Sequence, residues 1–384
     1  MAFAGNPLRL RRASKFRPGA DRQVDWSTAG PDRVLRPSRS GSRPAAAARS
    51  VTAVFALLLL LPACDRGARL SVISEDGVER QAAINRPARR TSPRPLLVLL
   101  HAGLLSGASM RDELEPLPAM ARQAGVALAF PDADGWFWDD GSLSRALPPA
   151  LSPAGDDLGF LDALIAALVA DGTADPAAIH IAGVSSGGMM ALRYACKRAE
   201  RLASVAVFLA TMPLDAERDC RPARPLPVLM VAGTADPVVR WTGEVALGGI
   251  ATLQRRMSVP ASFDFWRRVN RCAGVAPARP LPRRGRGSQP DVLVHAASGC
   301  AGGVRTLLYE VRGGGHRLTA GDDWTLLRLL GRATPDIEPA ALLLEFVLAH
   351  DRVPGLGQTR SSRPAAGEEP GSSVMRLAPA ANSW

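Results

Sequence analysis

Apolar residues along this chain gather in short continuous runs more often than in strict alternation with polar ones. These runs predict buried strands at 95–100, 126–130, 178–182, 202–209, 227–231 and 304–311. Between them, apolar positions at helical spacing predict helices near 120–123, 156–168, 188–195 and 339–350. Strands that alternate with helices indicate an α/β protein with a mostly parallel, doubly wound sheet and helices on both faces. Two edge strands are expected before this unit, at 70–73 and 81–84.

Three predicted strands end close to a side chain that is able to take part in catalysis. Ser185, Asp236 and His316 each follow such a strand. In doubly wound sheets, ligands bind beyond the carboxyl ends of the strands, so we expect these side chains to meet there. Their order along the chain is Ser, Asp, His. This is the order of the alpha/beta-hydrolases, and it differs from the orders in the two other major triad folds.

The most informative local motif is Gly183-Val-Ser-Ser-Gly187, which fits G-x-S-x-G. A strand before it and a helix after it are the context of a nucleophile elbow, in which Ser185 stands clear of the sheet. The alternative is a small-residue turn that only packs a helix on a strand. If Ser185 is the nucleophile, the backbone N–H of Ser186 is expected to bind the oxyanion, together with that of Gly103 in the loop after an earlier strand.

A serine nucleophile needs a base to take its proton, and the chain has five histidines from which to choose. His316 is the predicted base because it follows three glycines on a loop after a strand. His180 lies inside the elbow strand, and His101 is expected to shape the loop after its strand. His295 falls in a loop flanked by cysteines, and His350 ends the last helix.

The base in turn needs a group that holds it in the right tautomer. Asp236 is the predicted orienting residue because it follows Gly-Thr-Ala at a strand end. Asp215 and Asp219 are its rivals, but no strand ends just before them. The structural alternative for Asp236 is a solvated turn residue or a helix cap.

The first part of the chain has the features of a targeting segment. The run 51–63 is uncharged and mostly apolar, and it is shorter than the about 20 residues that a membrane span needs. With Arg43 and Arg49 before it, this run is typical of a signal-peptide h-region. The following Leu61-Pro-Ala-Cys64 resembles a bacterial lipobox, which makes Cys64 the expected site of lipidation. Ordinary signal cleavage without a lipid is the alternative.

These observations divide the chain into three parts. Residues 1–63 are expected to be a disordered extension plus the signal peptide, 64–354 the catalytic domain, and 355–384 a disordered tail. We expect an exported protein, secreted or periplasmic, that is attached to the bacterial envelope and its membrane through a lipid on Cys64. The net charge of +11 does not indicate a nucleic-acid partner, because residues 1–63 carry 11 basic and 3 acidic side chains and so account for +8 of it.

Cysteine usage agrees with export to an oxidising compartment. Besides Cys64, four cysteines remain, and this even number predicts two disulfides. Three connectivities are possible, of which we choose the two sequence-near pairs, Cys196–Cys220 and Cys272–Cys300. Scattered free thiols are the alternative. No spacing of Cys and His is typical of a zinc site, and we expect neither a metal nor an organic cofactor.

From about residue 96 to 321 the chain resembles the polyhydroxybutyrate depolymerase and feruloyl esterase family of secreted alpha/beta-hydrolases. The motifs that carry this resemblance are Val98-Leu-Leu-His-Ala-Gly103, Phe130-Pro-Asp132, Trp138-Asp-Asp-Gly141, Asp156-Asp-Leu-Gly-Phe-Leu161, Gly183 to Met190, Gly233-Thr-Ala-Asp-Pro-Val-Val239, Phe265-Trp266 with Asn270-Arg-Cys272, and Gly313-Gly-Gly-His316.

The resemblance implies the triad Ser185, Asp236 and His316 and the same two cysteine pairs. It also implies that the substrate is a carboxylic ester: a polyester oligomer, an ester on plant polysaccharide, or a small aryl or acyl ester. The chain departs from the family at Ala102, where a glycine is usual, and at 317–321, where the family's Thr-Trp-Pro-Gly is missing.

The sequence therefore predicts a serine carboxylic-ester hydrolase that works through an acyl-enzyme. A serine peptidase or a lactone hydrolase on the same fold is an alternative, since fold and triad do not fix the leaving group. A non-catalytic envelope protein that binds a ligand in a hydrolase-like pocket is another.

Overall fold

A computed structural model describes residues 68–74, 76–87, 94–141, 155–214, 216–247, 251–284, 291–319 and 329–350. All of them belong to one compact unit, Ala63–Trp384. The predicted signal segment 1–63, Cys64 and the predicted tail 355–384 lie outside the described residues. In the described part of the chain, no helix is long and apolar enough to cross a membrane.

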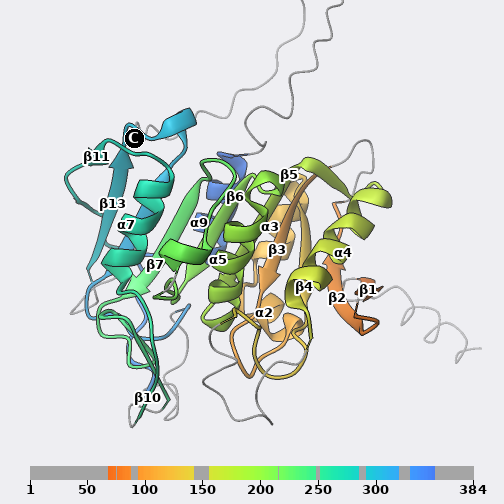
Figure 1. The fold of residues 1–384 in the computed structure, drawn as a ribbon, viewed down its shortest axis with the longest axis horizontal. Helices are drawn as coiled ribbons and strands as arrows, with labels where there is room; N and C mark the ends of the chain where they lie inside the picture. Colours follow the sequence, from red (N-terminus) through yellow and green to blue (C-terminus); the bar gives the residue numbers. More distant parts are fainter. Residues whose placement is uncertain are drawn as a thin grey trace, which may run out of the picture. The chain divides into compact units, whose positions relative to one another are not determined.

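A large sheet runs through the described unit (Figure 1). Its strand order is β1-β2-β4-β3-β5-β6-β7-β14-β13-β11, and β12 also pairs with β13. The six strands from β4 to β14 in this order are parallel, whereas β1, β2 and β13 pair antiparallel. The strands are β1 (Ala68–Ile73), β2 (Glu79–Asn85), β3 (Arg94–Leu100), β4 (Ala127–Pro131), β5 (Ala174–Val184), β6 (Ser204–Phe208), β7 (Val228–Gly233), β11 (Gly274–Val275), β12 (Arg279–Pro280), β13 (Val292–Ser298) and β14 (Thr306–Val311).

Helices cover both faces of the sheet because the side chains of each strand point alternately to one face and the other. On β3, Leu97 and Leu99 pack with one group of helices, and Leu96, Val98 and Leu100 pack with the other group. The first group is α2 (Gly107–Glu113), α3 (Leu117–Ala124) and α9 (Pro339–Leu348), and the second is α4 (Asp157–Ala170), α5 (Ser186–Arg198) and α7 (Val259–Val269). The predicted mostly parallel α/β sheet with helices on both faces is confirmed.

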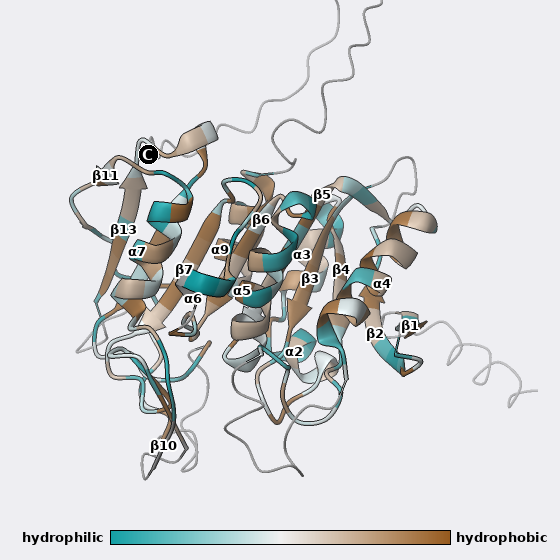
Figure 2. Cartoon of the chain, viewed as in Figure 1, coloured by the Kyte–Doolittle hydropathy of each residue, from teal (hydrophilic) through white to brown (hydrophobic). Residues whose placement is uncertain are grey.

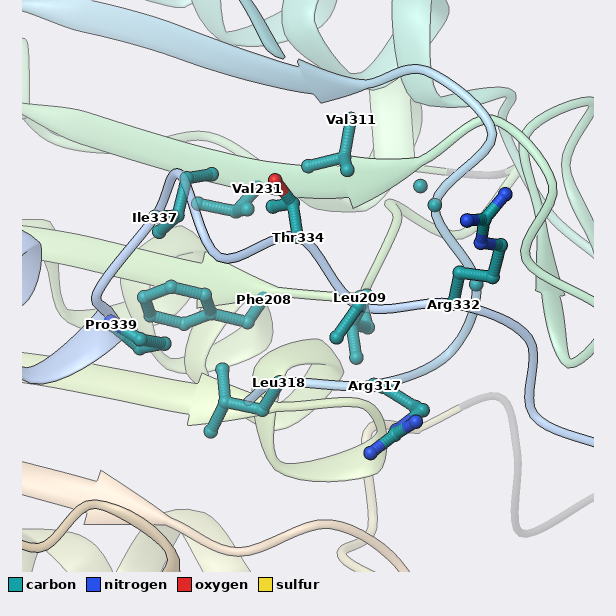
Figure 3. Close-up of a pocket in the computed structure, with 14 residues that line it drawn as sticks. Phe208, Leu209, Val231, Val311, Arg317, Leu318, Arg332, Thr334, Ile337 and Pro339 are labelled. Atoms are coloured by element: carbon teal, nitrogen blue, oxygen red, sulfur yellow. The ribbon is translucent and has the colours of Figure 1, made fainter. Parts of the chain in front are cut away.

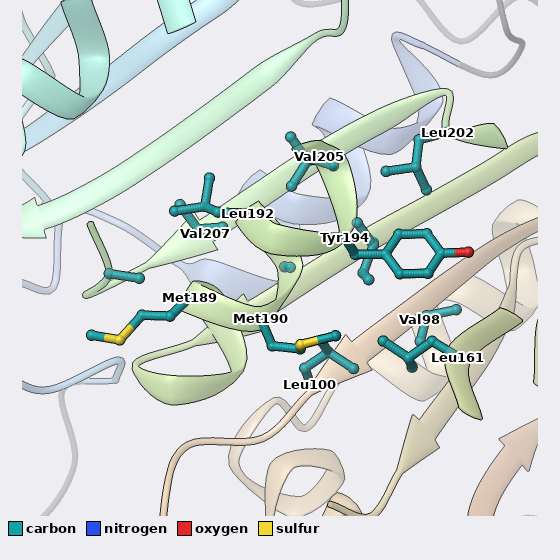
Figure 4. Close-up of a cluster of buried hydrophobic side chains, with 14 of the residues drawn as sticks. Val98, Leu100, Leu161, Met189, Met190, Leu192, Tyr194, Leu202, Val205 and Val207 are labelled. Carbon is teal, nitrogen blue, oxygen red and sulfur yellow. The ribbon is translucent and has the colours of Figure 1, made fainter. Parts of the chain in front are cut away.

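Part of the core is formed where α5 packs against the sheet. Met189, Met190 and Tyr194 of α5 pack with Leu100 of β3 and Val207 of β6 (Figure 4). The central strands are hydrophobic along most of their length, and hydrophilic residues lie on the helices (Figure 2). This packing fixes the start of α5 and hence the residue that precedes it, Ser185.

Several elements differ from the prediction. The expected helix near 120–123 is α3, whereas the helix α2, which ends before Pro116, was not predicted. His295 lies on β13 and not in a loop; in the sequence it interrupts the apolar residues of this strand after Val292-Leu-Val294, which leaves a run shorter than those of the predicted strands. The short strands β8 (Val239–Arg240), β9 (Glu244–Leu247) and β10 (Ala251–Arg255) and the helix α7 were not predicted.

Both predicted cysteine pairs form disulfides, Cys196–Cys220 and Cys272–Cys300. The first joins the end of α5 to the residue after the short helix α6 (Ala216–Asp219). The second joins the residues after α7 to the residue before the 3-10 turn Ala301–Gly303. Two disulfides in a chain of this kind agree with folding in an oxidising compartment.

Candidate active site

Ser185 sits in the sharp turn between β5 and α5. Its backbone has φ +53° and ψ −119°, a strained conformation for a residue with a side chain. A Cβ on Gly183 would overlap the backbone of Gly187, and a Cβ on Gly187 would overlap the carbonyl oxygens of Leu100 and His101. Both glycines of the motif are therefore required by close backbone approach, as a nucleophile elbow demands.

The structure brings the three predicted catalytic side chains together at one edge of the sheet. His316 Nε2 lies 3.1 Å from Ser185 Oγ, and His316 Nδ1 lies 2.7 Å from Asp236 Oδ2. The other oxygen of Asp236 accepts hydrogen bonds of 2.8 Å from the backbone N–H groups of Val238 and Val239. The Asp236 side chain is only 1% exposed and that of His316 12%. The carboxylate is thus fixed while the imidazole keeps access to solvent.

The loop Gly313–Arg317, here called the histidine loop, is held mainly by backbone contacts. The N–H of Gly315 donates to the carbonyl of Arg332, and that of His316 donates to Leu330. A Cβ on Gly315 would overlap the Leu330 carbonyl. Gly315 thus lets two stretches of backbone approach closely, which the sequence could not show.

The loop His101–Gly107, here called the oxyanion loop, follows β3. The N–H of Leu104 donates to the Trp136 carbonyl over 2.7 Å and is thereby occupied. None of the described backbone hydrogen bonds comes from the N–H of Gly103. Leu104 itself has φ +67° and a side chain that is 56% exposed. The start of this loop lies directly beside the elbow, because a Cβ on Gly187 would overlap the carbonyl oxygen of His101.

The other candidate histidines and aspartates lie elsewhere. His180 is fully buried in β5 and bonds to Ser204 Oγ, and burial lowers its pKa to about 3. His295 pairs with Glu310 on the neighbouring strand. Asp219 ends the short helix α6 with its side chain exposed, whereas Asp215 lies outside the described residues. Of the described three, His180, His295 and Asp219, none has a hydrogen bond to a triad side chain.

Sequence reasoning missed one carboxyl group near the triad. Glu113, at the end of α2, is partly buried, and burial raises its pKa against the lowering effect of the charges on His316 and Arg317. A helix-terminal glutamate carries no signal in the sequence that would mark it.

A narrow cavity of about 20 Å³ lies under the histidine loop, with room for one or two water molecules. Apolar side chains such as Phe208, Leu209 and Leu318 line it, and Arg317 and Arg332 lie on one side (Figure 3). It is too small for the acyl group of a substrate. In the described part of the chain, no cluster of three or more His, Cys, Asp or Glu side chains could hold a metal ion.

Comparison with solved structures finds several hydrolases of low sequence identity. The acetyl xylan esterase from Aspergillus awamori is 13% identical, covers 73% of this chain and 99% of its own, and has a TM-score of 0.45. An S-formylglutathione hydrolase from Agrobacterium tumefaciens is 19% identical, covers 52% and 80% of the two chains, and has a TM-score of 0.37. No protein-family model matches the chain.

Two proteins with esterase names are similar in sequence. NocK from Nocardia uniformis subsp. tsuyamanensis, which is assigned as an esterase, is 28% identical over 267 residues, or 66% of this chain and 74% of that protein. Feruloyl esterase B from Piromyces equi is 30% identical over 232 residues, or 58% of this chain and 39% of that protein. The chain thus spans about three quarters of the first relative and about two fifths of the second. These two relatives, together with the mostly parallel sheet, support an esterase-like alpha/beta-hydrolase that acts on carboxylic esters.

Proposed function

We propose that the chain cleaves carboxylic esters through an acyl-enzyme on Ser185, with His316 as base and Asp236 as orienting residue. The observation that carries this proposal is the continuous pair of contacts from Asp236 Oδ2 through the imidazole of His316 to Ser185 Oγ, at 2.7 and 3.1 Å. Both distances are within hydrogen-bond reach, and the order of the groups is that of a serine-hydrolase triad.

In the first step, Ser185 Oγ attacks the ester carbonyl and its proton passes to His316 Nε2. The positive imidazolium is stabilised by Asp236, which accepts the Nδ1–H and is itself held by two backbone N–H groups. The imidazolium then gives its proton to the leaving alcohol oxygen, and the acyl group remains on Ser185. In the second step, His316 takes a proton from water as the water oxygen attacks the acyl carbon. The bond between that carbon and Ser185 Oγ then breaks, the proton passes from His316 to Ser185 Oγ, and the acid leaves.

The negative charge that develops on the carbonyl oxygen needs donors that are already in place. We assign this role to the backbone N–H groups of Ser186 and Gly103. Ser186 begins α5, where backbone N–H groups have no partner within the helix. The competing N–H in the loop, that of Leu104, is already bonded to Trp136, which favours Gly103.

The substrate is proposed to be an ester with an apolar or aromatic group, of the kind that polyester depolymerases and feruloyl esterases cleave. One of the two named relatives is a feruloyl esterase. Leu104, Leu105 and Trp136 carry large apolar side chains that are 56%, 42% and 53% exposed. Leu104 and Trp136 are tied together by a backbone hydrogen bond at the oxyanion loop, which puts an apolar surface beside the candidate oxyanion donor.

We further propose that the protein is exported and lipid-anchored at Cys64. The two disulfides support export, and the lipobox-like residues 61–64 support the anchor. Metabolic labelling with a clickable palmitate should mark the full chain but not a Cys64→Ala variant. Equal labelling of both proteins would refute an anchor at this residue.

The test of the reaction is hydrolysis of short-chain acyl esters, aryl esters and a feruloyl ester by the full chain. Ser185→Ala should lose activity by several orders of magnitude, and Ser71→Ala, an exposed serine on β1, should keep it. A fluorophosphonate probe should label the parent but not Ser185→Ala.

Each other outcome has a definite meaning. Equal turnover by the parent and Ser185→Ala would contradict the assigned nucleophile. Faster cleavage of an amide than of the matched ester would favour a peptidase, and preference for a cyclic ester would favour a lactone hydrolase. A folded parent that neither turns over esters nor reacts with the probe would favour a ligand-binding protein.

A further inference from the structure

The segment 132–140, here called the strut, follows β4 and contacts the oxyanion loop repeatedly. At the start of the loop, Trp138 Nε1–H donates to the carbonyl of His101 over 3.1 Å. The backbone N–H of Ala133 donates to His101 Nε2 over 3.0 Å, and His101 Nδ1 lies 2.8 Å from the Ala102 carbonyl. Nε2 is therefore an acceptor and Nδ1 a donor, so the imidazole is neutral and its orientation is fixed at both nitrogens.

The strut also holds the middle and the end of the oxyanion loop. The Trp136 carbonyl accepts from the N–H of Leu104 over 2.7 Å. Asp132 Oδ1 accepts from the N–H of Gly107, the first residue of α2, also over 2.7 Å. Along the chain, Gly103, the candidate oxyanion donor, lies after the contact at His101 and before the contacts at Leu104 and Gly107.

An aromatic ring of the strut limits the remaining space at Gly103. A Cβ on Gly103 would overlap the ring of Phe137, so the glycine backbone lies directly on this ring. The loop is thus held by hydrogen bonds before and after Gly103 and by a packed ring at Gly103.

The far side of the strut is anchored in the protein interior by two buried ion pairs. Asp140 pairs with Arg256 at 2.6 Å, and their side chains are 1% and 0% exposed. The backbone N–H of Asp139 donates to Asp157, which pairs with Arg80 at 2.6 Å in an equally buried site. Both pairs are shielded from solvent, so the strut is tied to the body of the domain on this side as well.

We propose that the strut sets the position of the Gly103 N–H and that Trp138 is a positioning residue for the hydrolysis reaction. This inference rests on the proposed function, in which Gly103 N–H binds the oxyanion. Trp138 is fully buried and touches no substrate; it acts by fixing the carbonyl of His101, two residues before Gly103. Oxyanion donors must lie within about 2.7 to 3.1 Å of the developing charge, so a small displacement weakens transition-state binding more than substrate binding.

The experiment compares Trp138→Phe with Trp266→Phe in the full chain. Trp266, on α7, is also fully buried, but its Nε1 has no hydrogen-bond partner among the described residues. The two changes remove the same atoms from equally buried sites and differ in whether a hydrogen bond is lost. Steady-state kinetics on an aryl ester, the affinity for a boronic acid that forms a tetrahedral adduct, and Tm are measured for both variants.

We expect Trp138→Phe to lower kcat about tenfold, with KM nearly unchanged and boronate affinity lowered by a similar factor. This is less than the 10²- to 10³-fold effect of losing an oxyanion donor outright. Trp266→Phe should lower Tm by an amount comparable with that of Trp138→Phe and leave kcat unchanged. Equal kcat values in the two variants, or a change confined to KM, would overturn the proposal. A parent with no esterase activity would instead contradict the proposed function.

A second pair of variants keeps the proposal testable if Trp138→Phe does not fold. Asp132→Ala removes the acceptor for the Gly107 N–H, whereas Asp132→Asn keeps an oxygen at that place. We expect the alanine variant to lose kcat about threefold to tenfold and the asparagine variant to recover it. Failure of asparagine to restore kcat in folded protein would show that this contact does not position the loop.

Discussion

Two loops meet at Ser185, and they are held in place in different ways. The oxyanion loop is fixed largely by side chains, those of Trp138, His101 and Asp132. The histidine loop is fixed by backbone hydrogen bonds and by glycines that allow two chain segments to touch. A side chain can be changed in small steps, whereas a backbone contact between glycines tolerates no added atom. We therefore expect graded effects on the oxyanion side and abrupt ones on the histidine side.

The largest effect on kcat is expected from a change of Asp236, the residue that orients His316. Asp236→Asn keeps the size of the side chain but favours the wrong tautomer of His316, so kcat should fall about 10⁴-fold. The exposed Asp219 is the matched control, and Asp219→Asn should keep full activity. Kinetics on one aryl ester decide the matter, and a loss of less than tenfold in Asp236→Asn would exclude Asp236 as orienting residue.

A backbone contact on the histidine side is tested by Gly315→Ala. The added Cβ would overlap the carbonyl of Leu330, and neither partner is a flexible side chain. The loop must shift, and a misplacement of about 1 Å at His316 should cost about 100-fold in kcat. Gly274→Ala is the control, because its Cβ would make only an ordinary contact at 3.5 Å with Ser298. Parent-like activity in folded Gly315→Ala would show that the histidine loop is not held as rigidly as described.

The difference between the two sides also explains what the sequence could reveal. Ser185, Asp236 and His316 stand where apolar runs stop, so the strand pattern alone places them at the same edge of the sheet. The contacts of the strut leave no such pattern. Trp138 and His101 are 37 residues apart, and Asp140 and Arg256 are 116 apart. Local periodicity cannot report pairings between positions so distant. The strand β13 was missed because His295 ends its apolar run after three residues.

The comparison becomes sharpest when the same substitution is made on both sides. Gly103→Ala adds a Cβ that would overlap a side-chain ring, that of Phe137, instead of a backbone carbonyl. Because the ring of Phe137 is able to rotate away from the added Cβ, we expect kcat to fall about tenfold, which is less than for Gly315→Ala. Phe137→Leu added to Gly103→Ala should recover most of the loss, and Phe137→Leu alone measures the effect of the smaller side chain. If the double variant is no better than Gly103→Ala, the ring is not what limits the loop.

The smallest expected effect is on stability and concerns His101. Burial lowers the pKa of His101, with Arg80 acting in the same direction and the Ala102 carbonyl and Asp132 against it. Above pH 6.5 the imidazole is neutral in both the folded and the unfolded chain, so it adds no pH dependence. Below that value the unfolded chain binds a proton that the folded chain does not, and the free energy of unfolding falls until the lowered pKa is reached.

Because one group changes the free energy of unfolding by at most about 1.4 kcal/mol per pH unit, this effect needs a difference measurement. Urea unfolding of the parent and of His101→Gln at pH 8 and pH 5.5 supplies it, since glutamine does not titrate and its carboxamide oxygen can replace Nε2 as the acceptor for the Ala133 N–H. The parent should lose more stability between the two pH values than the variant. His180 and His350, whose pKa values burial also lowers, contribute equally to both proteins and cancel. An identical pH dependence would mean that the strut does not hold His101 neutral, and the side-chain anchoring of the oxyanion loop would then rest on Trp138 and Asp132 alone.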